Sequence, residues 1–455
     1  MRKVLALACL LVLGTSVSAA APTGSAPSFA RARNYAVGHG PWSVAIGDLN
    51  GDGKPDLATA DLNGRSVSVL LNGGDGSFRA RRDYGTRRFP ASVAIGDLNG
   101  DGKRDLAIAN SGSRKVSVLL NSGEGSFQTK LDYTTGLDPV SVAIGDLNGD
   151  GKPDLATATL EDSASVLLNR GDGSFEAKRD YATGRNPSSV AIDDLNGDGN
   201  LDLATANPDA DSFSVLLNRG DGTFRARRDY AGQMPESVAI GDLNGDGKPD
   251  LATANNDGNS VSVLLNKGDG TFRARRDYGA RRFAFSVAIG DLNADGKPDL
   301  ATANNNGNDS ASVLLNKGDG SFQAGLDYAT GAGTVQAAGP QSVAIGDLNG
   351  DARPDVATAN FGTGGADTVS VLLNRPGLCT VQDVEGKTLQ TAKRTLARAN
   401  CGVGKITRTY KKLTRTYKER VGRGRVISQR PTFGAVLPRG AKVHVVVSRG
   451  KRPRR

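Results

Sequence analysis

The chain has few of the side chains that most catalytic and redox sites use. Its 455 residues include 3 Cys, 2 His, 2 Met and 1 Trp, and aromatic residues make up 5 %. Neither His39 nor His444 has an evident nucleophile beside it in the sequence, so no Ser-His-Asp arrangement is indicated. No glycine-rich phosphate-binding loop precedes a helical pattern. The sequence therefore favours a protein that is not an enzyme.

Long apolar runs are also scarce. The run at the N-terminus, Val4–Leu13, follows two basic residues and is shorter than the roughly 20 residues of a membrane helix. We expect residues 1–20 to be a secretory signal, cleaved after Ala19 or Ala20, and the exported chain to be soluble with no transmembrane segment. The alternative is a lipoprotein acylated at Cys9, which would need a longer apolar stretch before the cysteine.

Export would leave two cysteines, Cys379 and Cys401. Two cysteines in an oxidising compartment usually pair, so we expect a disulfide between them. In the chain-entropy model it would stabilise the C-terminal region by roughly 3 kcal/mol. Two free buried thiols are the alternative.

Negative charge is scarce in the C-terminal part of the chain. Residues 376–455 hold 21 Lys and Arg against 3 Asp and Glu, a net charge of +18. The whole chain has a net charge of +9, so residues 1–375 have a net charge of 9 − 18 = −9. The basic tail, ending in residues 451–455, could meet anionic wall polymers or lipid headgroups through long-range attraction. Nucleic acid would fit the charge as well, but export argues against it. The bland alternative is a solvated basic end.

Glycine, in contrast, is abundant at 60 residues and punctuates a repeated acidic string. The string Asp-Leu-Asn-Gly-Asp-Gly-Lys-Pro-Asp returns seven times with little change, starting at Asp48, Asp97, Asp146, Asp194, Asp242, Asp291 and Asp347. The steps are 49, 49, 48, 48, 49 and 56 residues, and a period of this length indicates a repeat architecture.

Each repeat reads as four short strands separated by turn residues. In one unit they are residues 92–96, 105–110, 116–121 and 127–133. Four strands in about 48 residues are typical of a propeller blade, and helical periodicity is absent from 26 to 375. The seventh unit lacks its Phe…Tyr strand, and Phe29–Tyr35 supplies a matching one at the other end. We therefore predict a mainly-β fold, a seven-bladed propeller closed by the N-terminal strand. An open solenoid would instead need polar caps.

The acidic string has the composition of a calcium site. Calcium takes six to eight oxygen ligands, and carboxylates at alternate positions can face one centre. In the first copy the side chains of Asp48, Asn50, Asp52 and Asp56 and the backbone carbonyl of Lys54 would supply them. The predicted ligands of the seven copies are Asp48, Asn50, Asp52, Lys54, Asp56; Asp97, Asn99, Asp101, Lys103, Asp105; Asp146, Asn148, Asp150, Lys152, Asp154; Asp194, Asn196, Asp198, Asn200, Asp202; Asp242, Asn244, Asp246, Lys248, Asp250; Asp291, Asn293, Asp295, Lys297, Asp299; and Asp347, Asn349, Asp351, Arg353, Asp355.

The alternatives to calcium are a plain turn, because Asp, Asn and Gly are common turn residues, and magnesium, which rarely uses cages made only of protein. An EF-hand is not indicated, since its twelfth position would be Thr59. Seven loops hold 21 carboxylates, and seven calcium ions would supply +14, which suggests about seven structural ions and no catalytic role.

The copies differ at two glycine positions. Ala352 replaces the turn glycine of the seventh loop, and a left-handed conformation there would cost about 1–2 kcal/mol. We expect the seventh site to be the weakest. Ala294 replaces a glycine that we expect to be less demanding.

At these residues the chain resembles the FG-GAP/VCBS repeat family of secreted, integrin-α-like propellers. The resemblance is carried by the seven acidic loops and by Gly-Asp-Gly-(Ser/Thr)-Phe turns such as Gly74–Phe78, and it covers 26–375. It implies an extracellular calcium-binding propeller of the kind often used in adhesion or carbohydrate recognition. Some related propellers are lyases, so a secreted polysaccharide-active enzyme is the alternative function.

Residues 379–450 resemble a PASTA domain. The resemblance is carried by Val384–Leu389, Gly424–Gly434 and Leu437–Gly450, and it implies association with cell-wall peptidoglycan. The sequence predicts a helix over 389–400 and a strand over 443–448, a small α+β domain. The stretch 406–420 is longer and more basic than the resemblance leads us to expect.

The loops on the face opposite the acidic loops vary between repeats, and variable loops on a constant scaffold usually carry binding. We expect an envelope or extracellular glycan or protein ligand there, and peptidoglycan or an anionic wall polymer at the tail. The candidate ligand face consists of Trp42, Arg87, Arg88, Phe89, Arg281, Arg282, Phe283 and Phe285. The alternative is that these aromatic residues pack between blades and the arginines are solvated.

Overall fold

The computed structural model describes residues 26–128, 130–280, 283–305, 310–330, 339–362, 367–375, 379–380, 384–398, 402–409, 425–432, 436–437 and 442–448. These residues fall into two compact units. The first holds the described residues of 31–373, and the second holds those of 26–30 and those from 374 onward.

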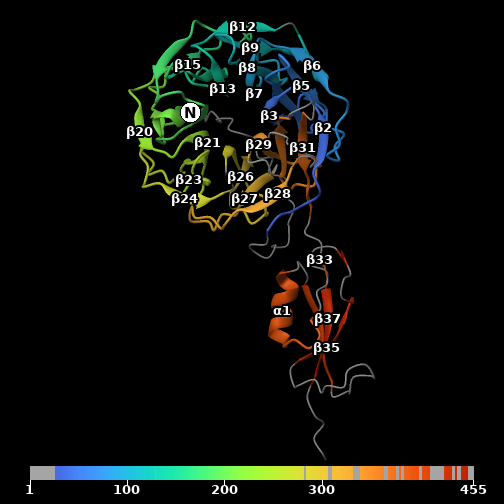
Figure 1. The fold of residues 1–455 in the computed structure, drawn as a ribbon. Coiled ribbons are helices and arrows are strands. Elements are labelled where there is room, and N and C mark those ends of the chain that lie inside the picture. Colours follow the sequence, from blue (N-terminus) through green and yellow to red (C-terminus); the bar gives the residue numbers. More distant parts are fainter. Residues whose placement is uncertain are drawn as a thin grey trace, which may run out of the picture. The chain divides into compact units, whose positions relative to one another are not determined.

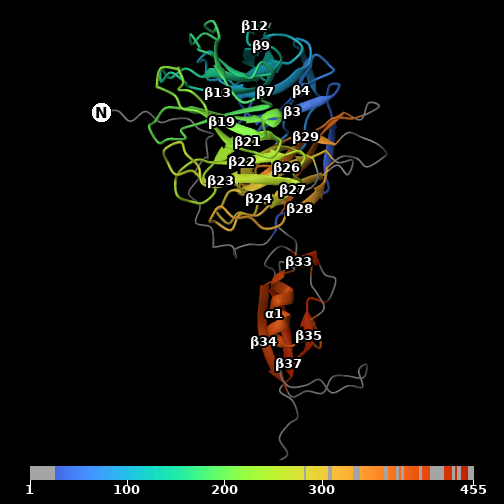
Figure 2. The ribbon, with the colours of Figure 1, turned by 60° about the vertical axis from the view of Figure 1, so that its left-hand side comes forward.

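The first unit contains seven four-stranded antiparallel sheets in its described part, and Figures 1 and 2 show them side by side in chain order. The sheets, each from its first to its fourth strand, are β3 (Pro41–Gly47), β4 (Asp56–Asp61), β5 (Ser66–Leu70), β6 (Arg82–Gly85); β7 (Pro90–Gly96), β8 (Asp105–Asn110), β9 (Lys115–Leu119), β12 (Leu131–Thr134); β13 (Pro139–Gly145), β14 (Asp154–Thr159), β15 (Ser163–Leu167), β16 (Arg179–Ala182); β17 (Ser189–Asp193), β18 (Asp202–Asn207), β19 (Ser212–Leu216), β20 (Arg228–Ala231); β21 (Pro235–Gly241), β22 (Asp250–Asn255), β23 (Ser260–Leu264), β24 (Arg276–Gly279); β25 (Ala284–Gly290), β26 (Asp299–Asn304), β27 (Ser310–Leu314), β28 (Leu326–Ala329); and β29 (Pro340–Gly346), β30 (Asp355–Asn360), β31 (Thr368–Leu372), β2 (Arg33–Ala36). The mainly-β class with repeated four-stranded sheets is confirmed.

The seventh sheet takes its fourth strand from the other end of the chain. Strand β2 pairs antiparallel with β31, with Arg33 opposite Val371 and Ala36 opposite Thr368. The expected Phe…Tyr strands, the N-terminal one included, are split, so their prediction as single strands is wrong. Phe78 makes only a bridge to Asn72, and the fourth strand begins four residues later at Arg82. In the second sheet that bridge widens into the hairpin β10 (Asn121–Gly123) and β11 (Ser126–Phe127).

The core lies between successive sheets rather than at one centre. Every residue of β4, with the sequence Asp-Leu-Ala-Thr-Ala-Asp, is buried, because both faces of the sheet are covered. Ala58 and Ala60 alternate along the strand and pack, with Val67, against the second sheet, which contributes Leu106. Small residues in the middle strand allow close approach of the next sheet, so each junction forms its own apolar cluster.

The first strands of neighbouring sheets are also joined by one recurring hydrogen bond. The backbone N–H of Val93 donates to Ser43 Oγ of the preceding sheet at 3.3 Å. The same bond joins Val142 to Ser92, Val190 to Ser141, Val238 to Ser189, Val287 to Ser237, Val343 to Ser286 and Val44 to Ser342. The last of these joins the first sheet to the seventh, and β3 accordingly contacts β29.

The second unit is a small α+β domain. Its described elements are β1 (Ser28–Phe29), β32 (Asn374–Arg375), β33 (Cys379–Thr380), α1 (Leu389–Arg398), β34 (Gly402–Thr409), β35 (Val426–Arg430), β36 (Val436–Leu437) and β37 (Lys442–Ser448). Helix α1 begins after Thr388, whose hydroxyl accepts the N–H of Thr391, and it packs Ala392 and Leu396 against the sheet β34-β37-β35. The expected helix and last strand are present, whereas β34 was not predicted.

The predicted disulfide between Cys379 and Cys401 lies outside the residues whose side chains are described. In the described part of the chain, no helix combines the length and the apolar character needed to cross a membrane.

One buried carboxylate distinguishes the first sheet from the others. Asp61 ends β4, is fully buried, and accepts hydrogen bonds from the hydroxyls of Thr59 (2.8 Å) and Ser68 (2.7 Å). Burial raises its pKa to about 6. The fourth sheet places Asn207 at this position, where it accepts from Thr205 and donates to Ser214 without carrying a charge.

We expect Asp61→Asn to stabilise the protein at pH 7.5. Because the folded-state pKa is raised above the ordinary value, stability that Asp61 contributes when protonated is lost as pH rises through about 6. Asn can accept from Thr59 and donate to Ser68, and it does not titrate, so the free energy of unfolding should rise by about 1–2 kcal/mol at pH 7.5. The gain should fade as pH approaches 4.

Denaturant unfolding at the two pH values measures this difference. Asn207→Asp is the matched control and should lower stability at pH 7.5. An equal gain for Asp61→Asn at both pH values would contradict the explanation by charge burial.

Candidate functional site

Each acidic loop joins the first and second strands of a sheet and is folded by its own side chains. In the first loop the Asp48 carboxylate accepts the backbone N–H of Gly51 at 2.7 Å and that of Gly53 at 2.8 Å. Asn50 Oδ1 accepts the N–H of Asp52 at 2.8 Å. Short acidic and amide side chains readily bond to backbone one turn on, which explains why this string forms a compact loop. In the other six loops the first acid likewise accepts the N–H of the sixth residue, and the bond from the N–H of the fourth residue recurs in five of them.

The last acid of each loop is buried and holds two chain segments together. Asp56 accepts the N–H of Leu49 at 2.9 Å with one oxygen and that of Asn72 at 2.7 Å with the other. Burial raises its pKa to about 6, and the nearby carboxylates of Asp52 and Asp48 add to the shift. The pKa values of Asp105, Asp154 and Asp250 are likewise raised to about 6, and those of Asp202 and Asp299 to about 7.

Asn72, whose backbone N–H donates to Asp56, also forms a hydrogen bond to the preceding sheet through its side chain. Asn72 Nδ2 donates to the carbonyl of Pro55 in its own loop at 2.7 Å and to that of Leu348 in the loop of the seventh sheet at 2.8 Å. The same bond to the preceding loop joins Asn121 to Leu49, Asn169 to Leu98, Asn218 to Leu147, Asn266 to Leu195 and Asn316 to Leu243. The acidic loops are therefore parts of the junctions between sheets.

The donors in these loops suit a hard cation, although their arrangement here serves the backbone. Three carboxylates, an amide oxygen and a backbone carbonyl are all oxygen ligands of the kind calcium prefers. A carboxylate oxygen has two lone pairs, so one that accepts an N–H can still bind a cation. Within the described ranges, no three His, Cys, Asp or Glu side chains are grouped so as to hold a metal ion.

The seventh position of the loop is Lys or Arg in six copies and Asn200 in the fourth. Lys54 Nζ is 3.5 Å from Asp52, and Lys103 Nζ is 3.0 Å from Asp101. Lys248 Nζ instead donates to the carbonyl of Lys267. The backbone carbonyl of this position stays a predicted ligand.

Both alanines that replace loop glycines are left-handed. Ala352 has φ of 61°, as expected, and Ala294 has φ of 57°. The glycines at the two positions in the first loop, Gly51 and Gly53, have φ of 76° and 80°. The expectation that the position of Ala294 is less demanding is therefore wrong, because both positions lie in the region that L-residues with a Cβ avoid.

On the opposite face, the predicted ligand-face residues are spread over several sheets. Trp42, on β3 of the first sheet, packs edge-to-face on Phe361 of the seventh at 6.0 Å between ring centroids. Phe89, before β7, and Phe283, before β25, are 40 % and 41 % exposed. Phe285 on β25 is half-buried. Packing between sheets thus applies to Trp42, whereas Phe89 and Phe283 face solvent.

The arginines of the predicted face differ in their partners. Arg87 pairs with Asp132 at 2.7 Å, and the Arg88 guanidinium lies 5.5 Å from the centroid of the Phe89 ring. Arg281 and Arg282 lie outside the described residues. The described members come from the first, second and sixth sheets, so one continuous patch remains a prediction.

The sequence analysis missed a His-Asp pair next to Trp42. His39 Nδ1 lies 2.6 Å from Asp367 Oδ2, with His39 60 % exposed and Asp367 7 % exposed. The other oxygen of Asp367 accepts the N–H of Gly362 at 3.0 Å, which fixes the carboxylate. In the tautomer that donates from Nδ1, Nε2 is the acceptor nitrogen of the His39 ring.

Aromatic and amide side chains lie close to this pair. A Cβ built on Gly40, the residue after His39, would be 3.0 Å from the Phe361 ring and 2.9 Å from Asn63 Nδ2. We call the group His39, Trp42, Asn63, Phe361 and Asp367 the His39 corner. The only sequence signal for it is that the single Trp and one of the two His lie three residues apart.

Comparisons with known proteins agree with this organisation. A family model described as FG-GAP-like repeat matches residues 48–108, 97–157, 146–205, 194–253, 242–302 and 291–358, and a PASTA domain model matches 380–449. No curated protein matches the chain.

Solved structures with a similar fold share little sequence. One is BBS1N in complex with ARL6DN, with 12 % identity over 76 % of this chain and 97 % of that one and a TM-score of 0.54. Another is an Agrocybe aegerita lectin described as recognising non-reducing terminal N-acetylglucosamine, with 22 % identity over 74 % of this chain and 86 % of that one and a TM-score of 0.48. The neighbours are β-propeller proteins, so these likenesses concern the fold alone.

We expect Ala352→Gly and Ala294→Gly each to raise the free energy of unfolding by about 1 kcal/mol, because glycine adopts the left-handed conformation without strain. The matched control is Gly53→Ala, which should cost a similar amount. A Cβ at Gly53 would have no atom within 4 Å, so backbone strain alone should act there. Chemical denaturation of the three variants measures the effects, and a neutral Gly53→Ala would contradict the assignment.

Proposed function

Because this chain belongs to the FG-GAP-like repeat family and carries a PASTA domain, we propose that it is a secreted, envelope-associated adhesion or ligand-binding protein that is not an enzyme. The β-propeller would present the ligand site, and the PASTA domain, which suggests binding related to the cell wall, would hold the protein at the envelope. Peptidoglycan or an anionic wall polymer is the partner proposed for the C-terminal part.

We further propose that the seven sheets form one closed seven-bladed ring. Two contacts across the first and seventh sheets support closure, Val44 to Ser342 and Asn72 to Leu348, and within the seventh sheet the N-terminal strand β2 pairs with β31. The first two belong to series that also join successive sheets. The N-terminal strand would then protect the edge that β31 otherwise exposes.

Calcium is proposed to stabilise this ring rather than to take part in chemistry. Each loop brings three carboxylates to one end of a sheet junction, and lysines such as Lys54 and Lys103 offset only part of their mutual repulsion. A cation bound to folded loops stabilises the fold by linkage. The all-oxygen donor set and its seven-fold repetition support calcium over other ions.

The His39 corner is the observation that carries the proposed ligand site. A nearly buried carboxylate fixes an exposed imidazole, and an aromatic pair and an exposed amide lie beside it. Small-molecule and glycan sites combine apolar or aromatic surface with a few fixed polar groups of this kind. The corner is also unique in the first unit, whereas the acidic loops are nearly identical. We therefore assign the ligand, a glycan or a protein segment, to this corner.

The same pair supports the alternative function, a polysaccharide lyase. An imidazole oriented by a carboxylate is a suitable general base, because the free Nε2 can accept a proton from a bound substrate. We rank this second, since the described neighbours named above offer no separate acid opposite Nε2.

We expect calcium to raise the melting temperature. At a concentration one hundred times the Kd of a site, binding there should add about 2.7 kcal/mol to the free energy of unfolding. Asp48→Asn should gain less stability from calcium than the parent does, because one proposed ligand carboxylate is lost. Asp75→Asn, in the exposed Gly-Asp-Gly turn, is the matched control and should respond to calcium as the parent does. Differential scanning calorimetry with calcium and with chelator measures both effects, and identical melting in the two would remove the proposed role.

We expect Trp42→Ala and His39→Gln each to weaken retention on a glycan array at least tenfold. His39→Gln should leave the melting temperature nearly unchanged, because the ring is mostly exposed. Phe89→Ala, exposed on another sheet, is the control. Retention without product favours adhesion, and unsaturated sugar products that vanish in His39→Gln favour the lyase. Unaltered retention in both variants would exclude the His39 corner.

A further inference from the structure

A basic motif marks the outer edge of some sheets and not of others. The string Phe-Arg-Ala-Arg-Arg-Asp-Tyr leads into and forms the fourth strand of the first, fourth and fifth sheets, at 78–84, 224–230 and 272–278. The sixth sheet instead has Phe-Gln-Ala-Gly-Leu-Asp-Tyr at 322–328. The outer edge is therefore basic in two adjacent sheets, the fourth and the fifth, and neutral or acidic in the sixth.

The middle arginine of the motif is used within the sheet. Arg227 Nε lies 2.9 Å from Asp229, and Arg275 Nε lies 3.0 Å from Asp277. Asp229 is itself held by the hydroxyl of Ser214 at 2.6 Å. The ion pair thus involves the middle arginine of each motif and not the first or the third.

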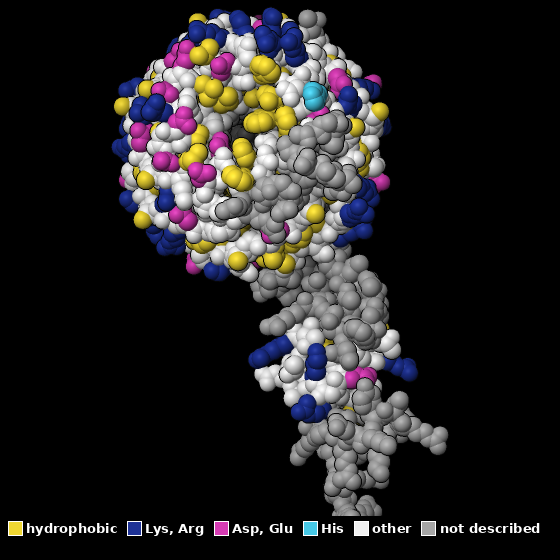
Figure 3. Space-filling view, in the orientation of Figure 1, with side chains coloured by type: hydrophobic (Ala, Val, Ile, Leu, Met, Phe, Trp, Pro, Cys, Tyr) yellow, Lys and Arg dark blue, Asp and Glu magenta, His cyan; other side chains and the backbone are white. Residues whose placement is uncertain are grey.

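The first and third arginines are exposed and make no ion pair with an acid in the described part of the chain. They are Arg225, Arg228, Arg273 and Arg276, which we call the rim arginines. Figure 3 shows Lys and Arg side chains gathered along the edge of the first unit. Each motif holds three arginines and one aspartate, so the two outer strands carry a local charge of +4 in a region, residues 1–375, that nets −9.

The packing of the two sheets brings rim arginines to one seam. Tyr230 of β20 meets Phe272 edge-to-face at 5.3 Å, and its hydroxyl donates to the carbonyl of Gly270 at 3.1 Å. Arg273 follows Phe272 directly. Arg228 lies two residues before Tyr230 and so on the same side of the strand. Arg228 and Arg273 therefore flank the seam between the fourth and fifth sheets.

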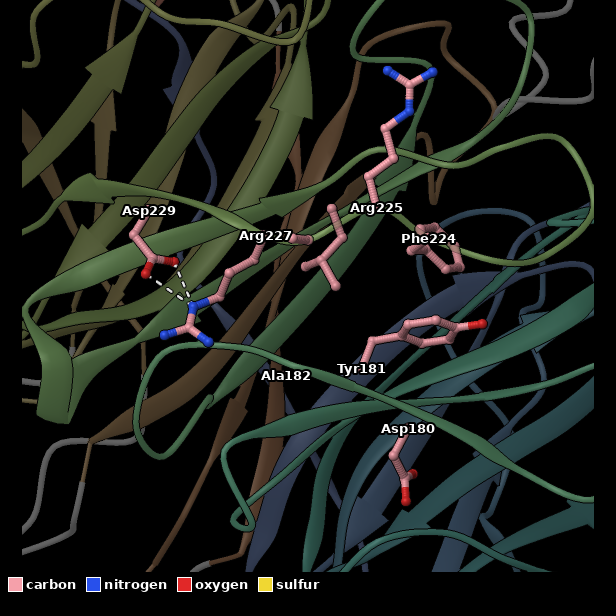
Figure 4. A pocket seen from close by; sticks show the side chains of 9 residues that line it. Asp180, Tyr181, Ala182, Phe224, Arg225, Arg227 and Asp229 are labelled. Atoms are coloured by element: carbon pink, nitrogen blue, oxygen red, sulfur yellow. Dashed lines mark hydrogen bonds and ion pairs between the residues drawn. The ribbon is translucent and has the colours of Figure 1, made fainter.

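The junction between the third and fourth sheets contains a surface pocket. A surface pocket of about 500 Å³ lies between β16 and the segment leading into β20, with Tyr181 and Phe224 in its wall. In Figure 4 Arg227 turns toward Asp229, whereas the guanidinium of Arg225 points away from Asp180 and Asp229. The rim thus offers an unpaired guanidinium beside a partly apolar hollow.

We propose that the rim arginines bind a phosphate-bearing polymer that runs along the outer strands of the fourth and fifth sheets. A fixed cluster of like charges is unfavourable unless an anion neutralises it. All four positions carry Arg rather than Lys, and the guanidinium fork matches phosphate oxygens with two parallel hydrogen bonds. A polymer can meet several arginines across the seam at once, which a single small anion cannot do. This surface is separate from the His39 corner and does not depend on it.

The test compares two four-fold variants of the full chain for binding to inorganic polyphosphate. Arg225→Gln, Arg228→Leu, Arg273→Gln and Arg276→Leu together give both sheets the residues that the sixth sheet carries, Gln323 and Leu326, which the fold already accepts. The control removes four scattered exposed cations by Arg65→Gln, Arg104→Gln, Arg185→Gln and Lys317→Gln, so the net charge and the basic tail are the same in both. The double variant Arg225→Gln and Arg273→Gln serves if the four-fold variant melts early.

We expect the rim variant to bind polyphosphate at least fivefold more weakly than the parent at low salt, and the control less than twofold. The slope of log affinity against log salt should fall by about one for each phosphate that an arginine no longer neutralises. Polygalacturonate, a carboxylate polymer, should bind more weakly and with less dependence on the rim. Equal weakening in the rim and control variants, no weakening in either, or rim-dependent binding of polygalacturonate as tight as that of polyphosphate would overturn the proposal.

Discussion

A buried carboxylate that bonds to two backbone N–H groups supports the rest of the first unit. Asp56 ties the start of the acidic loop, at Leu49, to Asn72, which begins the following turn. Asn72 then donates to the loop of the preceding sheet. A buried charge is costly unless it is well paired, and here each oxygen has a strong donor. Strand order, loop shape and sheet contact at each junction thus depend on one acid.

Most of the fold could be predicted because its signals are local and repeated. The acidic string, the Leu-Ala-Thr-Ala strand and the Phe…Tyr segment recur at nearly fixed spacing, and the missing Phe…Tyr segment identified the N-terminal strand that pairs with β31. The split of that segment was missed because Phe78 looks like part of an alternating strand, although it only bridges Asn72. Strand β34 was missed because its two glycines and short apolar content give no clear period.

Two kinds of contact in the site could not be predicted from the sequence: those between residues far apart along the chain, and those between side chains and backbone N–H groups. His39 and Asp367 are separated by 328 residues, and nothing near either one indicates the other. The loop carboxylates could be counted from the sequence, but their bonds to backbone N–H groups could not. The conformation of Ala294 was misjudged for the same reason, since φ at a loop glycine cannot be read from its identity alone.

The hydrogen bonds between first strands all run in one sense, from the valine of each sheet to the serine of the sheet before it. Every sheet therefore donates this bond on one side and accepts it on the other. A substitution in one sheet can create a local feature, such as His39 or the arginines of the fourth and fifth sheets, without altering the junctions between the other sheets. Evolution can therefore specialise such a series of sheets one sheet at a time.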